Sequence, residues 1–125
     1  RFVSWTFDLE GTYMDLRNNI FYIAKDIQVF GPVKKRVGHV RVGIGDQKRS
    51  NNLYFSPQNP DPIGVPAKED DLIMNPLFLD IENHNFRLKE NSPARKKGYS
   101  VGYFSDLDQY PVSLKGKVDL GAYEF

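Results

Sequence analysis

The sequence predicts an all-β chain built from stacked repeats, with little or no helix, and three observations lead to this prediction. Apolar and polar residues alternate over several short segments, which is the pattern of strands with one buried face. The segment 18–22, two asparagines followed by an aliphatic and two aromatic residues, is repeated with the same order of residue types at 51–55, 33 positions further along. Only residues 66–74 have a helix-compatible composition, and they are long enough for a single turn behind Pro66.

Alternating segments predict strands at residues 3–9, 14–17, 20–23, 26–30 and 39–44. Turn residues separate them: Gly11 follows the first segment, the pair Gly31-Pro32 ends the fourth, and a polar turn is expected at 46–50. The chain opens in a strand, with neither a start methionine nor a charged leader. We therefore expect a cleavage product or a part of a longer protein, with an open edge at residues 2–9 that favours self-association.

Two pairs of asparagines, at 18–19 and 51–52, open the repeated segments. Asparagine tolerates left-handed backbone angles, and its amide can hydrogen-bond the equivalent residue one rung away, so the pairs predict bends that stack on each other. The alternative is that they are two unrelated hairpin corners, because asparagine is common in turns. A β-sandwich binding domain also stays open on composition alone, and parallel stacking of the two segments would dismiss it.

Composition limits the classes of function. A chain of 125 residues that is 40% hydrophobic predicts one domain with its own core, and no window approaches the roughly 18 apolar residues of a membrane-spanning helix. The 17 basic and 16 acidic residues are spread along the chain, so we expect no nucleic acid among its partners. The absence of cysteine excludes disulfides and thiolate chemistry.

The second half of the chain carries four ordered motifs: Asn-Pro-Leu-Phe-Leu-Asp at 75–80, Asn-Phe-Arg-Leu-Lys at 85–89, Ser-Pro-Ala at 92–94, and Val-Asp-Leu-Gly-Ala-Tyr-Glu at 118–124. Together they resemble the terminal segment of right-handed parallel β-helix proteins of the pectate-lyase-like superfamily. The resemblance implies a right-handed parallel β-helix, with about three incomplete coils of roughly 20 to 35 residues in 1–74 and a capping tail in 75–125. Two departures weaken any site in the tail: Asn75 stands where an acidic residue is usual, and basic residues fill 95–97.

The resemblance also implies roles and partners. The tail would cover the apolar end of the last coil, whose other neighbours would be coils preceding Arg1. Polysaccharide would be the partner, calcium is possible as a cofactor in the longer protein while none is identified in this chain, and the location would be secreted, periplasmic or at the cell surface. The residues expected to form the cap are Asn75, Pro76, Phe78, Asp80, Phe86, Ser92, Pro93, Asp119, Gly121, Tyr123 and Glu124.

Candidate site residues are few, and each has an ordinary structural interpretation. His39 and Arg41 share the outward face of one predicted strand, where arginine could pair with a sugar carboxylate, but any half-buried strand exposes some polar pair. The acidic clusters 69–71 and 106–108 match no calcium-loop spacing. No residue is predicted to be catalytic, because the sequence contains no nucleophile, phosphate-loop or metal motif.

Two functions from different classes follow. In the first, the chain is the C-terminal portion of a carbohydrate-active β-helix protein that acts on polysaccharide as a lyase or glycoside hydrolase in its full-length form, with most of the chemistry on other coils. In the second, it is a non-catalytic glycan-binding, scaffold or adhesin module, because one fold carries many functions.

Overall fold

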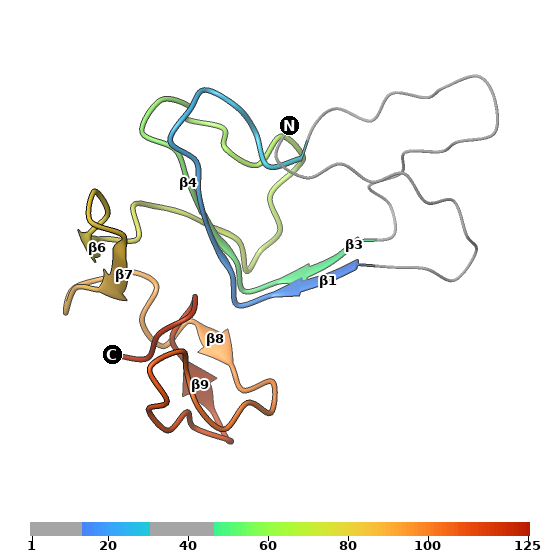
Figure 1. Ribbon diagram of the computed structural model, residues 1–125. Helices are drawn as coiled ribbons and strands as arrows, with labels where there is room; N and C mark the ends of the chain where they lie inside the picture. The colour runs from blue at the N-terminus through green and yellow to red at the C-terminus, as the bar shows by residue number, and fades with distance from the viewer. Residues whose placement is uncertain (1–13, 31–46) are drawn as a thin grey trace.

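The computed structural model describes residues 14–30 and 47–125, and within these ranges the chain is largely β, in small sheets, with no helix (Figure 1). Accordingly, the described part contains no helical segment that could cross a membrane. Its strands are β1 (Met14–Arg17), β2 (Ile20–Tyr22), β3 (Gln47–Ser50), β4 (Leu53–Phe55), β5 (Leu72–Ile73), β6 (Phe78–Asp80), β7 (Asn85–Leu88), β8 (Gly98–Tyr99) and β9 (Lys117–Val118).

The first five strands pair in parallel, one turn of chain upon the next. β1 pairs with β3 and β2 with β4, so that Met14 faces Gln47 and Ile20 faces Leu53. Figure 1 shows the two turns side by side through the strands and through the bend between them. β5 then pairs with β4, with Leu72 beside Leu53, so the step from β4 to β5 covers 19 positions, against 33 positions from β2 to β4. The spacing of 33 positions between the repeated segments therefore equals the sequence offset between paired residues of the first two turns.

The bends between the paired strands consist of the two asparagine pairs. Asn18 and Asn51 have φ angles of 57° and 52°, the left-handed conformation that asparagine tolerates. The Nδ2 of Asn19 donates to Oδ1 of Asn52 at 3.1 Å, and Nδ2 of Asn52 donates to the carbonyl of Leu16 at 2.9 Å. The predicted hydrogen bond between equivalent asparagines is confirmed. Because the strands are parallel, the hairpin-corner and β-sandwich alternatives are wrong for these segments.

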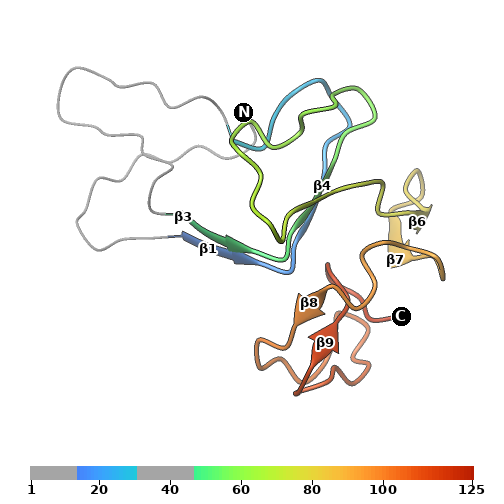
Figure 2. The ribbon, with the colours of Figure 1, turned by 180° about the vertical axis from the view of Figure 1, so that it is seen from behind.

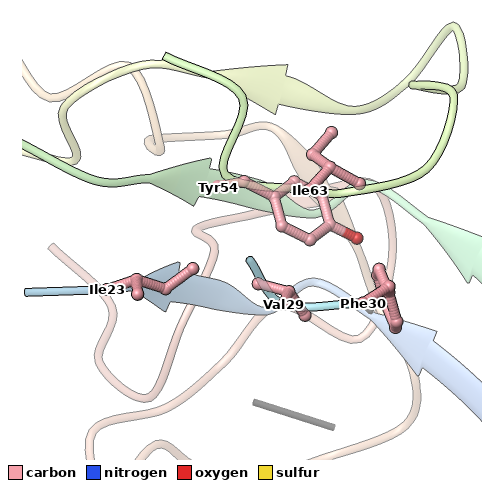
Figure 3. Packing of buried hydrophobic residues seen from close by; sticks show 5 residues of the cluster. All are labelled: Ile23, Val29, Phe30, Tyr54 and Ile63. Atoms are coloured by element: carbon pink, nitrogen blue, oxygen red, sulfur yellow. The ribbon is translucent and has the colours of Figure 1, made fainter. Parts of the chain in front are cut away.

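Two hydrophobic clusters lie inside the described structure. The first lies between the first two turns, where the rings of Phe21 and Tyr54, which are register partners, stack at 5.1 Å with 9° between their planes. Its buried members are Ile23, Val29, Phe30, Tyr54 and Ile63 (Figure 3). The second joins β4 to the tail and has the buried members Leu53, Leu88, Ala94 and Leu120. Burial of a large apolar side chain contributes about 1.5 to 3 kcal/mol, so the second cluster attaches the tail to the stack.

The tail is made of antiparallel pairs. β6 pairs with β7, and β8 pairs with β9, with Gly98 facing Val118. Figure 2 shows the C-terminus close to β8 and β9. β7 thus covers most of the second tail motif, at residues 85–88.

Two sequence predictions are wrong in detail. The sequence predicts a polar turn at 46–50, but residues 47–50 form strand β3. The alternation of apolar and polar residues that marks a strand is absent here, because the inward position holds the charged Arg49, which faces Asp71. Residues 26–30 were expected to alternate in a strand. Instead Val29 and Phe30 are both buried and Ile27 is 37% exposed, and the N–H groups of Val29 and Phe30 donate to the carbonyls of Pro62 and Ile63 one turn away. The strands expected at 3–9 and 39–44 lie outside the described residues.

Candidate functional site

A groove of about 500 Å³ lies beside β1 and β3, and the charged residues in its lining are mainly basic. Arg17 from β1 and Lys48 from β3 contribute to one wall, together with Lys68 from the turn before β5. Asp15 is the acidic residue of this lining, and Tyr99 with the two residues after it forms the opposite wall.

The parallel pairing places these charges on one face. Side chains alternate along a strand, so Asp15 and Arg17 are exposed while Leu16 between them is partly buried. The register sets Asp15 beside Lys48 and Leu16 beside the buried Arg49. The outward positions of two successive turns therefore form one continuous polar surface.

Arg17 is held in place within this surface. Its Nε donates to Oδ1 of Asp15 at 2.8 Å, and its Nη2 donates to the other carboxylate oxygen. This hydrogen bonding, supported by the charges of Arg17 and Lys48, lowers the pKa of Asp15, which keeps its carboxylate ionised. The groove thus carries a fixed guanidinium beside two lysines, a set that can pair with carboxylate or sulfate groups.

The asparagine bends fix the opposite wall. Asn18 makes two hydrogen bonds to the backbone of Tyr99, donating from Nδ2 to the carbonyl at 2.6 Å and accepting from the N–H at 3.2 Å. One turn further, Nδ2 of Asn51 donates to the carbonyl of Lys97 at 3.0 Å. Between these contacts, a Cβ on Gly98 would lie 2.7 Å from Oδ1 of Asn18, so only glycine fits without a shift. Tyr99, which is 55% exposed, is thereby held at the groove.

A larger hollow, of about 720 Å³, lies between β1 and the C-terminal loops. Besides Asp15 of β1, three carboxylates of the tail line it, and each of these three accepts from backbone N–H groups: Asp106 from Glu124, Asp119 from Lys96 and Phe125, and Glu124 from Asp119. Burial, with the charges of Asp119 and Asp106, raises the pKa of Glu124. These contacts close the tail on itself, so we interpret the carboxylates as structural.

The structure also locates the two acidic clusters considered for calcium. Asp70 accepts the N–H of Asn51, Asp71 accepts the N–H of Lys68 and faces Arg49, and Asp108 pairs with Arg87. Within the described ranges no group of three or more His, Asp or Glu side chains is placed to hold a metal ion. The carboxylates serve backbone and arginine groups instead.

The first residues expected to cap the coils surround the hairpin of β6 and β7. Ser92 Oγ donates to the carbonyl of Pro76 at 2.6 Å and accepts the N–H of Ala94. Phe78 packs against the second hydrophobic cluster and against the ring of Phe86 at 5.5 Å, whereas Leu79 is 49% exposed. Two others make local turns: Asn75 accepts the N–H of Leu77, and Asp80 accepts from Asn83.

The remaining cap residues lie at the end of the chain. Pro93 is partly buried between Ser92 and Ala94. The N–H of Gly121, with a φ of 95°, donates to the carbonyl of Asn18 at 2.8 Å, which joins the tail directly to the first bend. Tyr123 lies under the guanidinium of Arg87 at 4.7 Å.

Sequence reasoning placed the binding residues elsewhere. His39 and Arg41 lie outside the described residues. The basic groove was missed because Lys48 stands in a segment interpreted as a polar turn, and Lys68 in the segment 66–74 interpreted as a single helical turn. The 33-residue repeat could have paired 14–17 with 47–50 and brought Arg17 and Lys48 to one face.

Comparison with known proteins adds no relative: no protein-family profile, no curated protein and no solved structure matches the chain.

Proposed function

We propose that the chain forms the end of a parallel β-helix and that its basic groove binds an acidic polysaccharide. The observation that carries the proposal is the presence of Arg17, Lys48 and Lys68 on one open groove of about 500 Å³ beside Tyr99. Guanidinium and ammonium groups pair with sugar carboxylates, and an exposed tyrosine ring offers a face on which a sugar ring can stack. The lining takes residues from two successive turns, so the site is open to a polymer that contacts both.

Three features support the β-helix part of the proposal. β1 and β2 stack in parallel on β3 and β4 with one constant offset, and β5 adds a parallel strand to β4 after a shorter step. Buried asparagine amides link the bends of successive turns, as expected for a solenoid whose units bury their faces against each other. The motifs of the tail resemble the end of pectate-lyase-like proteins, and in this chain the tail packs on β4 through Leu88, Ala94 and Leu120.

In its full-length form the protein would be a polysaccharide lyase or a glycoside hydrolase. The alternative function is a non-catalytic module that binds glycan without turnover. A lyase needs cationic groups around a uronate carboxylate and a base beside the neighbouring carbon, and this groove offers the cations. The alternative is favoured by a specific observation. In the described tail, Asp106, Asp119 and Glu124 all bind backbone N–H groups, which leaves them poorly placed as the carboxyl pair of a hydrolase.

Titration calorimetry of the chain with polyuronates tests the binding proposal, with a neutral glucan of similar length for comparison. We expect binding to the polyuronate that weakens as salt is added, because the paired charges are exposed. Replacing Lys48 and Lys68 together by alanine removes two ion pairs and should weaken binding about tenfold. The matched control replaces Lys89 and Lys115, which are exposed and do not line the groove.

Equal affinity for the neutral glucan, or equal loss in the control double variant, would contradict the groove as the binding site. Absorbance of the unsaturated uronate product, measured on the same samples and on any longer form of the protein, separates lyase action from binding alone. Binding with no product in the longer form would favour the non-catalytic module.

A further inference from the structure

A charged and polar cluster lies inside the second turn, around Arg49 of β3, which also contributes to the lining of the groove. Arg49 is 7% exposed and Tyr54 is fully buried. The side chain of Asp71 is also fully buried. In the preceding turn the register partners of Arg49 and Tyr54 are Leu16 and Phe21, so the interior changes from apolar to polar between two rungs.

Arg49 and Tyr54 both contact the ring of Phe30, and Asp71 faces Arg49. Arg49 Nη2 lies 3.6 Å from Asp71 Oδ2, and the guanidinium lies over the ring of Phe30 at 5.1 Å. The ring of Tyr54 meets Phe30 edge-on at 6.4 Å, and Figure 3 shows its hydroxyl on the Phe30 side. Arg49 Nη2 also donates to the carbonyl of Pro66 at 3.1 Å, and Asp71 Oδ2 accepts the N–H of Lys68 at 2.8 Å. The cluster therefore holds the turn 66–71 against the stack.

Each of the three side chains keeps one polar atom without a hydrogen-bond partner among the described residues: Arg49 Nη1, Tyr54 Oη and Asp71 Oδ1. Leaving such an atom unpaired in the interior costs free energy comparable to a lost hydrogen bond. Burial, with the nearby carboxylate of Asp71, raises the pKa of Tyr54 to about 12, although the neighbouring side chains of Arg49 and Asn52 act to lower it. The three atoms are a donor, a hydroxyl that can donate or accept, and an acceptor.

We propose that these three atoms form a buried site for an ordered water molecule, which bridges Arg49 to Asp71 and to Tyr54. The water accepts from Nη1 of Arg49, donates to Oδ1 of Asp71, and shares a third hydrogen bond with the Tyr54 hydroxyl. Water fits the set better than an ion does, because an anion would face the Asp71 carboxylate and a cation would face the guanidinium. Three hydrogen bonds are typical of buried structural water.

The site has a consequence for the turn that carries Lys68. Because Arg49 and Asp71 bind backbone groups of Pro66 and Lys68, a bridged and rigid cluster fixes that turn, and with it one wall of the groove. Arg49 and Asp71 are in this respect positioning residues.

The replacement Tyr54→Phe tests the site, because the two possibilities change stability in opposite directions. If the hydroxyl is unpaired, its removal from the interior stabilises the chain. If it binds the bridging water, its removal costs a hydrogen bond, and the midpoint of urea unfolding falls. We expect a lower midpoint for Tyr54→Phe and no change for the control Tyr103→Phe, whose side chain is 71% exposed.

A high-resolution crystal structure of the wild-type chain gives the second readout. We expect one water within hydrogen-bonding distance of all three atoms, and its displacement or loss in the Tyr54→Phe crystal. An unfolding midpoint at or above that of the wild type, or a wild-type structure in which the three atoms bind protein groups or no water, would overturn the proposal.

Discussion

Replacement of Asn52 by alanine tests whether the asparagine bends hold the parallel turns together. Asn52 is fully buried and its side chain makes three hydrogen bonds to the preceding turn. It accepts from the backbone N–H of Asn19 at 3.0 Å and from Nδ2 of Asn19 at 3.1 Å, and it donates to the carbonyl of Leu16 at 2.9 Å. Alanine removes all three and leaves a small gap in their place.

The magnitude follows from these contacts. A hydrogen bond within a protein contributes about 0.5 to 1.5 kcal/mol net, and more when its loss leaves a buried partner unpaired. Three bonds at a fully buried position give a loss of about 3 kcal/mol in the free energy of unfolding. Asn19→Ala should cost less, about 1 kcal/mol, because Asn19 is only partly buried and its backbone N–H still donates to Asn52.

Urea unfolding followed by tyrosine and tryptophan fluorescence measures both variants. With a denaturant slope of about 2 kcal/mol per molar for a chain of this size, Asn52→Ala should lower the midpoint by roughly 1.5 M. Asn91→Ala, at an exposed position, is the control and should change stability by less than about 0.5 kcal/mol. A loss below about 1 kcal/mol for Asn52→Ala would refute the idea that its side chain joins the two turns.

Two further predictions concern the tail. Gly98→Ala places a Cβ 2.7 Å from Oδ1 of Asn18 and 3.1 Å from Cγ2 of Val118, so we expect a loss of about 1 to 3 kcal/mol and faster proteolysis near β8, and unchanged proteolysis would contradict this packing. Glu124 has a raised pKa in the folded chain, so its contribution to stability is fully present below the ordinary glutamate pKa and is lost as pH rises through the raised value. The stability of the wild type relative to Glu124→Gln should therefore fall over that pH interval, and a difference independent of pH would count against the burial of this carboxyl group.

The repeated turns were predictable because their signal is local and occurs twice. In both turns a pair of asparagines, the first with a left-handed backbone angle, precedes apolar residues. The distance between the two copies in the sequence equals the offset between paired residues of β2 and β4. The tail was predictable only in outline. Its motifs include the residues of β7 and the residues Pro76 and Ser92, which the structure joins by a hydrogen bond. They do not reveal the antiparallel pairing of β8 with β9, because that pairing joins residues far apart whose patterns are too short to distinguish.

The groove was not predictable from patterns of hydrophobicity. Lys48 stands in a strand whose inward residue is the charged Arg49, so the alternation that marks other strands is missing. Arg49 is tolerated inside because Asp71 lies 3.6 Å away, on a segment 22 positions further along. A single-sequence pattern does not reveal such a pairing, since the rule that charged residues stay outside fails only where the fold supplies a partner.

The two asparagines of each bend have different roles: one joins neighbouring turns, and the other binds the tail beside the groove. The second asparagine points inward: Asn19 and Asn52 bind each other and fix one turn upon the next. The first points outward: Asn18 and Asn51 bind the backbone of Tyr99 and Lys97, so the tail lies across the bends with one contact per turn. Because Tyr99 forms a wall of the basic groove, the repeat that builds the parallel stack also sets the geometry of the proposed polysaccharide site. A change at Asn52 should therefore act mainly on stability, whereas a change at Asn18 should act on the groove as well.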